Sequence, residues 1–214
     1  MDAPDNTPDT SPARHSFDHL AASPLVKAEY RRGNRFSRWI GRCALALLGW
    51  QMVGPPPDMP KTIIIAAPHT SNWDLIIALS GMLALGMPIH FMMKREAFFW
   101  PLGSLWKYLG GIPVDRKSKN DLTSQMAEWI KREEVIWIAI TPEGTRSKVP
   151  GYRKGYLRIA AAAEVPVYLF GVDSPNKKVV LHGVLPTSGD FDADALAHYA
   201  YVSERYTGVK PKNN

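Results

Sequence analysis

Residues 62–74 read TIIIAAPHTSNWD, and the rest of the chain is organised around this stretch. Its first four residues are apolar or β-branched, which predicts a buried strand over 62–65. Two alanines and a proline end the strand, and Ser71 and Asn72 are suitable N-caps for an apolar helix over 75–85. His69 therefore lies at the mouth of a strand-to-helix turn, with Asp74 in the first part of the helix. Many α/β enzymes place their chemistry in such a turn.

Apolar runs elsewhere in the chain alternate between strand and helix patterns. We expect further strands over 89–93, 135–140, 165–170 and 179–185, and helices over 121–132, 154–163 and 192–206. The pattern predicts a single α/β domain over 57–208, with a mostly parallel sheet flanked by helices, preceded by an amphipathic N-terminal helix and followed by a basic tail over 209–214. Residues 97–109 are aromatic and apolar, and they predict short helices that either pack on the core or line a groove for an apolar ligand.

The composition narrows the class of partner. The chain has 214 residues, with 26 Lys and Arg against 20 Asp and Glu, and a formal net charge of +6. This charge favours phosphorylated substrates, anionic lipid or an acidic carrier protein. Nucleic acid is the least favoured partner, because the positive charge is not gathered on an aromatic-bearing reader motif. Cys43 is the only cysteine, so the chain has no internal disulfide and no CxxC metal site.

The N-terminal quarter divides into a tail and a helix. Residues 1–24 are rich in proline and aspartate and have no apolar stretch, which predicts a disordered tail. Residues 25–56 are expected to form an amphipathic helix with arginines on one face and apolar residues on another. Two interpretations remain open: a helix at a membrane surface, which Trp39 and Trp50 favour, or a helix packed on the core. No apolar run reaches the roughly 18–20 residues needed to span a bilayer.

His69 and Asp74 are the first candidates for catalysis. Histidine has an unperturbed pKa near neutrality, which suits a general base, and a nearby carboxylate fixes its tautomer. A helix-capping aspartate beside an incidental histidine gives the same pattern. Zinc is disfavoured because HxxxxD lacks a third ligand nearby. There is no GxSxG motif, and Cys43 lies away from this stretch, so the base would activate a substrate hydroxyl or water.

Two glycine-bearing turns near strand ends carry arginines suited to an anion. Arg116 follows GGIPVD, and Arg146 follows TPEGT. A guanidinium matches phosphate oxygens, and glycine lets backbone amides approach a ligand. Glu143 is placed either to accept from a substrate hydroxyl or to hold an arginine. Surface ion pairs, each contributing about 0–1 kcal/mol, are the alternative for these residues.

Four segments, in this order, resemble the motifs of the lysophosphatidic acid and glycerol-3-phosphate acyltransferase superfamily: HTSNWD at 69–74, GGIPVDRKS at 110–118, TPEGTRS at 141–147 and VPV at 165–167. The resemblance implies an α/β acyltransferase fold with His69 as the base and Asp74 as its orienting partner. It also implies that the acceptor is bound, chiefly through its phosphate, by Arg116, Glu143, Gly144, Thr145 and Arg146. The chain departs from the family pattern at Pro68 and Thr141, where Asn and an aromatic residue are usual. These departures affect the expected identity of the acceptor more than the expected type of reaction.

The resemblance implies a reaction that these residues can perform. We expect an O-acyltransferase that moves a fatty acyl group to a lysophospholipid hydroxyl, with 1-acylglycerol-3-phosphate as the expected acceptor. Acyl-CoA or acyl-carrier protein is the co-substrate, without a resident cofactor or metal. A thiol has a pKa of about 8.5, so the thiolate is a fair leaving group without help from an acid. The reaction mainly needs a base that deprotonates the attacking hydroxyl.

Two further expectations concern the oxyanion and the location of the protein. The amides at the helix N-terminus after His69 are candidates for binding the oxyanion. The expected location is the cytoplasmic face of the membrane, as a peripheral or monotopic protein. A thioester hydrolase and a non-catalytic lipid-binding protein at the membrane surface are the alternatives.

Overall fold

A seven-stranded sheet forms the centre of the computed structural model, which describes residues 26–114 and 122–213. The strands lie in the order β1-β7-β6-β2-β5-β3-β4. Their bounds are β1 Gln51–Val53, β2 Lys61–Ala67, β3 Ile89–Lys94, β4 Gly111–Val114, β5 Ile136–Ile140, β6 Val167–Asp173 and β7 Lys178–Leu185. Neighbouring strands run parallel, except that β6 and β7 pair antiparallel. The prediction of an α/β fold with a mostly parallel sheet is confirmed.

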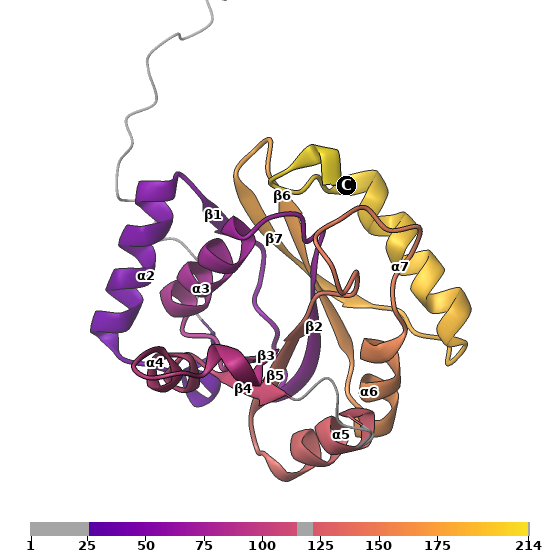
Figure 1. Ribbon diagram of the computed structural model, residues 1–214, viewed down its shortest axis with the longest axis horizontal. Helices are drawn as coiled ribbons and strands as arrows, with labels where there is room; N and C mark the ends of the chain where they lie inside the picture. The colour runs from indigo at the N-terminus through magenta and orange to yellow at the C-terminus, as the bar shows by residue number, and fades with distance from the viewer. Residues whose placement is uncertain (1–25, 115–121, 214) are drawn as a thin grey trace, which may run out of the picture.

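Helices cover both faces of the sheet (Figure 1). One face packs against α2 and α3, and the other packs against α5, α6 and α7. The helix bounds are α2 Arg35–Leu48, α3 Trp73–Leu85, α4 Leu102–Tyr108, α5 Leu122–Arg132, α6 Gly155–Ala163 and α7 Phe191–Arg205. Short 3₁₀ turns complete the described chain: η1 Ala28–Tyr30, η2 Arg95–Ala97 and η3 Pro211–Asn213.

Strand β2 lies at the centre of this arrangement, between β6 and β5. Ile63 and Ile65 pack into the core beneath α5, α6 and α7, and Ile64 packs into the core beneath α2 and α3. All three are completely buried. Burial of each such side chain stabilises the fold by about 1.5–3 kcal/mol. The continuous apolar run is therefore explained by a strand buried on both faces, and the strand places residues 68–72 at the carboxyl edge of the sheet.

The expected helix over 25–56 is wrong in extent. The α2 helix begins after Asn34, whose side chain accepts a hydrogen bond from the Ser37 N–H, and it ends at Gly49 in the left-handed conformation with a φ of 70°. Residues 51–53 then form β1, which pairs in parallel with β7. The domain therefore includes this segment and does not begin at residue 57. The predicted tail over 1–24 lies outside the described residues.

The α2 helix packs on α3 most closely at a small residue, Gly41. Ser37, Gly41 and Leu45 are buried. A Cβ atom at Gly41 would lie 2.4 Å from the Ala84 nitrogen, so only glycine allows this close approach. The helix is thus fixed to the domain, and yet it leaves large apolar side chains in solvent: Phe36, Trp39, Ile40 and Leu47.

The segment around α4 is exposed in the same way. Its outward apolar side chains are Phe99, Trp100, Leu102 and Leu105. Figure 1 shows α2 and α4 on the same side of the molecule. We call these eight side chains of α2 and the α4 segment the apolar surface. Among the helices of the described chain, none is long and apolar enough to cross a bilayer.

Candidate active site

His69 and Asp74 are brought together at the end of β2. His69 lies in the loop after β2, and Asp74 lies in the first turn of α3. The His69 Nδ1 atom is 3.0 Å from Asp74 Oδ2. An ionised carboxylate only accepts hydrogen bonds, so Nδ1 carries the proton and Nε2 keeps a lone pair. This pair therefore presents a base that can take a proton from a substrate.

Asp74 also organises the loop that carries His69. The same Oδ2 atom accepts hydrogen bonds from the Thr70 N–H at 2.7 Å and the Ser71 N–H at 2.8 Å. These two amides point at the carboxylate, so neither Thr70 nor Ser71 meets the expectation that amides after His69 bind an oxyanion. Asn72 occupies the N-cap position of α3 but makes no capping hydrogen bond with its side chain. The Asp74 carboxylate binds the loop amides in its place.

Glu143 supports His69 from the loop after β5. Its carboxylate Oε1 accepts a hydrogen bond from the His69 backbone N–H at 3.1 Å. The residue is only 6% exposed. Burial raises the pKa of the Glu143 carboxyl, and the hydrogen bonds that it accepts from the backbone of Glu143 and His69 oppose this rise. Glu143 thus fixes the loop that carries His69, and it also faces a cavity.

The rest of the 141–147 loop lies at the surface beside this pair. Gly144 has a φ of +66°, and a Cβ atom there would lie 3.0 Å from the Arg153 side chain. The Thr145 hydroxyl accepts from the Ser147 N–H at 3.4 Å, which shapes the turn. Arg146 donates a hydrogen bond to the Asn72 side chain. The loop therefore places one guanidinium close to the start of α3. Arg116, the other predicted arginine, lies outside the described residues.

The C-terminal segment makes two hydrogen bonds with Thr70, the residue after His69. The Thr70 hydroxyl accepts from the Lys210 N–H, and its carbonyl accepts from the Asn213 side chain, both at 3.0 Å. Val209 packs against the core beneath α2 and α3. Residues 209–213 are therefore folded against the site and do not form a separate basic tail. The sequence offered no signal for this contact, because the partners are 140 and 143 positions apart.

A large cavity opens beside His69. It encloses about 660 Å³ between the sheet and α3, and we call it the apolar cavity. Its inner walls include Ile64, Ile77, Met82, Met87, Ile89, Phe170 and Val179. Polar residues that also line it include His69, Asn72, Asp74 and Arg146. A long apolar ligand bound there would have one end beside the histidine. In residues 26–114 and 122–213, no three His, Cys, Asp or Glu side chains gather as metal ligands would.

Comparison with known proteins assigns the chain to a family. A family profile described as Acyltransferase matches residues 56–172, which is more than half of the chain. The chain belongs to the Acyltransferase family. The matched region includes His69, Asp74 and the whole 141–147 loop. It also includes β2, β5 and nearly all of β6, the strands whose ends build the site.

Relatives within this family carry more specific names. A 1-acyl-sn-glycerol-3-phosphate acyltransferase from Neisseria gonorrhoeae and one from Neisseria meningitidis serogroup B are each 34% identical over 92 residues. The matches cover 42% of this chain but only 34% of each relative, about a third of its length. The solved structure of the 1-acyl-sn-glycerophosphate (LPA) acyltransferase PlsC from Thermotoga maritima covers 81% of both chains at 20% identity, with a TM-score of 0.57. That similarity shows a shared fold.

Proposed function

We propose that the protein is an O-acyltransferase that moves a fatty acyl group from an acyl thioester to the hydroxyl of a lysophospholipid, with 1-acylglycerol-3-phosphate as the acceptor. The observation that carries the proposal is the His69–Asp74 pair at the apolar cavity, 3.0 Å apart and accompanied by Arg146. The names of the two Neisseria relatives support the choice of acceptor.

The proposed reaction needs one base and no covalent enzyme intermediate. His69 Nε2 takes the proton of the acceptor hydroxyl as its oxygen attacks the thioester carbonyl. The carbon–oxygen bond forms, the carbon–sulfur bond breaks, and the proton passes from His69 to the departing thiolate. Asp74 stabilises the imidazolium between these steps. General base catalysis of this kind contributes roughly 10²–10⁴ to a rate.

The apolar cavity is assigned to the fatty acyl chain. Its volume of about 660 Å³ lies within the usual range for small-molecule sites, roughly 300–1,000 Å³. Its lining includes five methionines, whose flexible side chains adapt to an extended chain: Met52, Met82, Met87, Met92 and Met93. Each methylene buried there stabilises the complex by about 0.8 kcal/mol. The carbonyl end of the chain would then lie beside His69.

Arg146 is assigned to the acceptor phosphate. It is exposed, and no carboxylate among the described residues pairs with it. One of its N–H groups donates to the Asn72 side chain, and the others remain available for a phosphate, which a guanidinium binds through two parallel hydrogen bonds. Arg153 lines the same cavity and adds to the positive potential there. Thr145 and Gly144 shape the turn that presents Arg146.

The apolar surface is assigned to a membrane. The acceptor and product are lipids, and the side chains of α2 and α4 expose aromatic rings of the kind enriched at membrane interfaces. Arg35 and Arg38 on α2 add charges that attract anionic lipid. We place the protein at the cytoplasmic face of the membrane, as a peripheral or monotopic protein.

A single assay tests the proposed function. The purified protein is mixed with [¹⁴C]palmitoyl-CoA or the equivalent acyl-carrier protein, with and without 1-acylglycerol-3-phosphate, and both free thiol and labelled lipid are measured. We expect thiol release that requires the acceptor, with one labelled phosphatidate formed per thiol. Labelled free fatty acid instead would identify a thioester hydrolase. Binding of lipid vesicles without any thiol release would identify a non-catalytic lipid-binding protein.

A further inference from the structure

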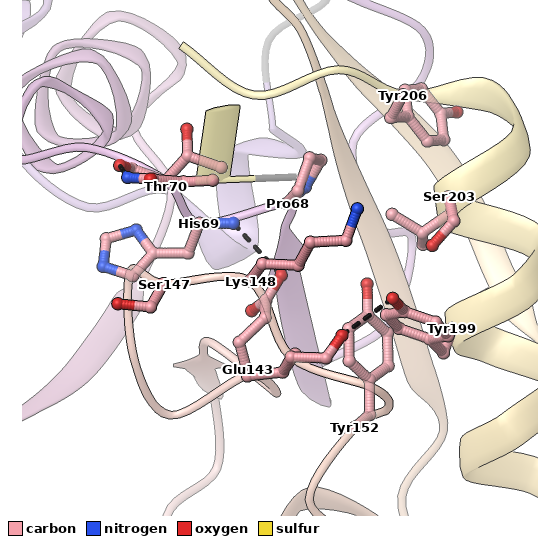
Figure 2. Close-up of a pocket in the computed structure, with 13 residues that line it drawn as sticks. Pro68, His69, Thr70, Glu143, Ser147, Lys148, Tyr152, Tyr199, Ser203 and Tyr206 are labelled. Carbon is pink, nitrogen blue, oxygen red and sulfur yellow. Dashed lines mark hydrogen bonds between the residues drawn. The ribbon is translucent and has the colours of Figure 1, made fainter. Parts of the chain in front are cut away.

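A second, smaller cavity borders His69, and the reaction proposed above does not use it. It encloses about 210 Å³ and shares only Pro68 and His69 with the apolar cavity. Figure 2 shows His69 and Ser147 toward one side of it, and the α7 residues Tyr199 and Ser203, with Tyr206 directly after α7, on the other. We call it the polar cavity, because hydroxyl groups and one carboxylate line much of it.

Glu143 provides an unpaired acceptor in the polar cavity. Its Oε1 atom is bonded to the His69 N–H, but its Oε2 atom is buried and has no hydrogen-bond partner within the described residues. Glu143 lines this cavity and not the apolar one. A buried carboxylate oxygen without a partner is costly, and an N–H or O–H group of a ligand would relieve that cost.

Donors line the same cavity as this acceptor. The Tyr152 hydroxyl has no hydrogen-bond partner in the described part of the chain, and it lines the cavity together with Ser203. The Tyr199 hydroxyl donates to the Val149 carbonyl at 2.8 Å and is already used. Figure 2 shows the Lys148 side chain extending across this space toward α7. The cavity therefore offers an acceptor on one wall, a free hydroxyl on another and a positive charge near its rim.

These features select the chemistry of the ligand. A phosphate group inside the cavity would face the Glu143 carboxylate, whereas Arg146, the residue assigned to the acceptor phosphate, lines the other cavity. A volume of 210 Å³ corresponds to about seven waters at roughly 30 Å³ each, enough for a thin chain but not for a nucleotide. The ligand that fits is a narrow chain bearing amide N–H and carbonyl groups.

We propose that the polar cavity binds the pantetheine arm of the thioester donor, with an arm amide N–H donating to Glu143 Oε2 and an arm carbonyl accepting from the Tyr152 hydroxyl. The inference rests on the proposed acyltransferase function and names a separate subsite for it. The arm carries the reacting sulfur at one end and a phosphate at the other, so the sulfur lies beside His69 and Lys148 meets the phosphate. CoA and acyl-carrier protein both carry this arm, and assays with each of them show which one is the acyl donor.

A series of shortened donors tests the inference. Wild-type protein is assayed for acyl transfer to 1-acylglycerol-3-phosphate with palmitoyl-CoA, palmitoyl-pantetheine and ethyl thiopalmitate, which has no arm. Each hydrogen bond to the arm contributes a factor of roughly 3–10, so kcat/KM should fall at least about 10-fold from the pantetheine thioester to the ethyl thioester. Equal values for these two donors would overturn the inference and leave the proposed function standing. Failure of every donor in the wild type would overturn the proposed function, and the inference with it.

Two variants locate the arm. Ser203→Phe on the exposed side of α7 fills the polar cavity, and Ala200→Phe on the same helix is the matched control outside it. Ser203→Phe should lower kcat/KM about 10-fold for palmitoyl-CoA, palmitoyl-pantetheine and palmitoyl-carrier protein, and less than about 2-fold for the ethyl thioester. Tyr152→Phe removes only a hydroxyl. It should lower kcat/KM roughly 3–10-fold for the three donors that carry the arm and leave the ethyl thioester nearly unaffected.

The pattern of the decreases in kcat/KM across the donors shows whether the polar cavity binds the arm. Equal losses with every donor, including the ethyl thioester, would show that the variants disturb His69 and would contradict the arm site. A loss confined to palmitoyl-CoA would assign the cavity to the nucleotide end of that carrier, which also contradicts it. Thermal unfolding followed by circular dichroism confirms that each variant is folded before its rates are compared.

Discussion

Removing the charge of Asp74 while keeping its shape should separate the orienting role of this residue from its charge. In Asp74→Asn the amide oxygen can take the place of Oδ2 and still accept from His69 Nδ1, Thr70 N–H and Ser71 N–H. The new NH₂ group then occupies the Oδ1 position, which is buried without a partner among the described residues. The site geometry is kept, but the imidazolium formed during the reaction loses its counter-charge.

The size of both effects follows from these contacts. Hydrogen bonds to a charged group contribute about 1.5–3 kcal/mol and neutral ones about 0.5–1.5 kcal/mol, a difference of about 1–1.5 kcal/mol per bond. Neutralising an acceptor of three bonds should therefore destabilise the fold by about 3–4.5 kcal/mol. Loss of imidazolium stabilisation should lower kcat by about 10²–10⁴. The rate of thiol release at saturating concentrations of both substrates gives kcat. Unfolding in urea gives the free energy of unfolding.

Asp192→Asn is the matched control for this experiment. Asp192 lies in the first turn of α7, with its side chain 83% exposed and paired with Lys154. An exposed pair of this kind contributes about 0–1 kcal/mol, so the control should keep both stability and kcat near wild type. A folded Asp74→Asn protein with kcat within about 3-fold of wild type would refute the role given to the pair.

Three further predictions concern other parts of the molecule. Because burial raises the folded-state pKa of Glu143, the wild type should lose stability as pH rises from the unfolded pKa near 4.5 through the folded value. Unfolding of Glu143→Gln should lack this loss, while Glu128→Gln, which changes an exposed carboxylate on α5, should retain it. Arg146→Lys should raise the KM for 1-acylglycerol-3-phosphate about 10-fold and leave the KM for the donor unchanged, as measured by initial rates. Trp39→Ser should weaken flotation with anionic vesicles several-fold, whereas Leu196→Ser, which changes a similarly exposed apolar residue on α7, should not.

The parts of the site that were predictable from sequence are local. His69 and Asp74 are five positions apart, and a strand followed by a capped helix brings such residues together whatever the rest of the fold does. The buried run at 62–65 likewise specifies a central strand, because only a strand covered on both faces needs apolar residues at every position.

The parts that were not predictable depend on strand order. Glu143 reaches His69 across 74 positions because β2 pairs in parallel with β5, with Ile65 opposite Ile140, so the loops that follow lie side by side. Apolar periodicity identifies strands but does not say which ones are neighbours. The contacts of Lys210 and Asn213 with Thr70 are hidden for the same reason.

The N-terminal helix was mispredicted for a different reason. Helical periodicity identified the face that carries Phe36 and Ile40, but it could not say whether that face or the small-residue face with Gly41 packs on the domain. The structure buries Gly41 and exposes the aromatic face. Gly49 was the available signal that the helix ends before residue 51.

The central claim is that His69 deprotonates the acceptor hydroxyl. The most direct measurement is the transfer of [¹⁴C]palmitate from its thioester to 1-acylglycerol-3-phosphate by folded His69→Ala protein, compared with wild type at equal concentration. We expect a rate lower by about 10²–10⁴, with thermal unfolding close to wild type. Transfer at the wild-type rate by the folded variant would contradict it.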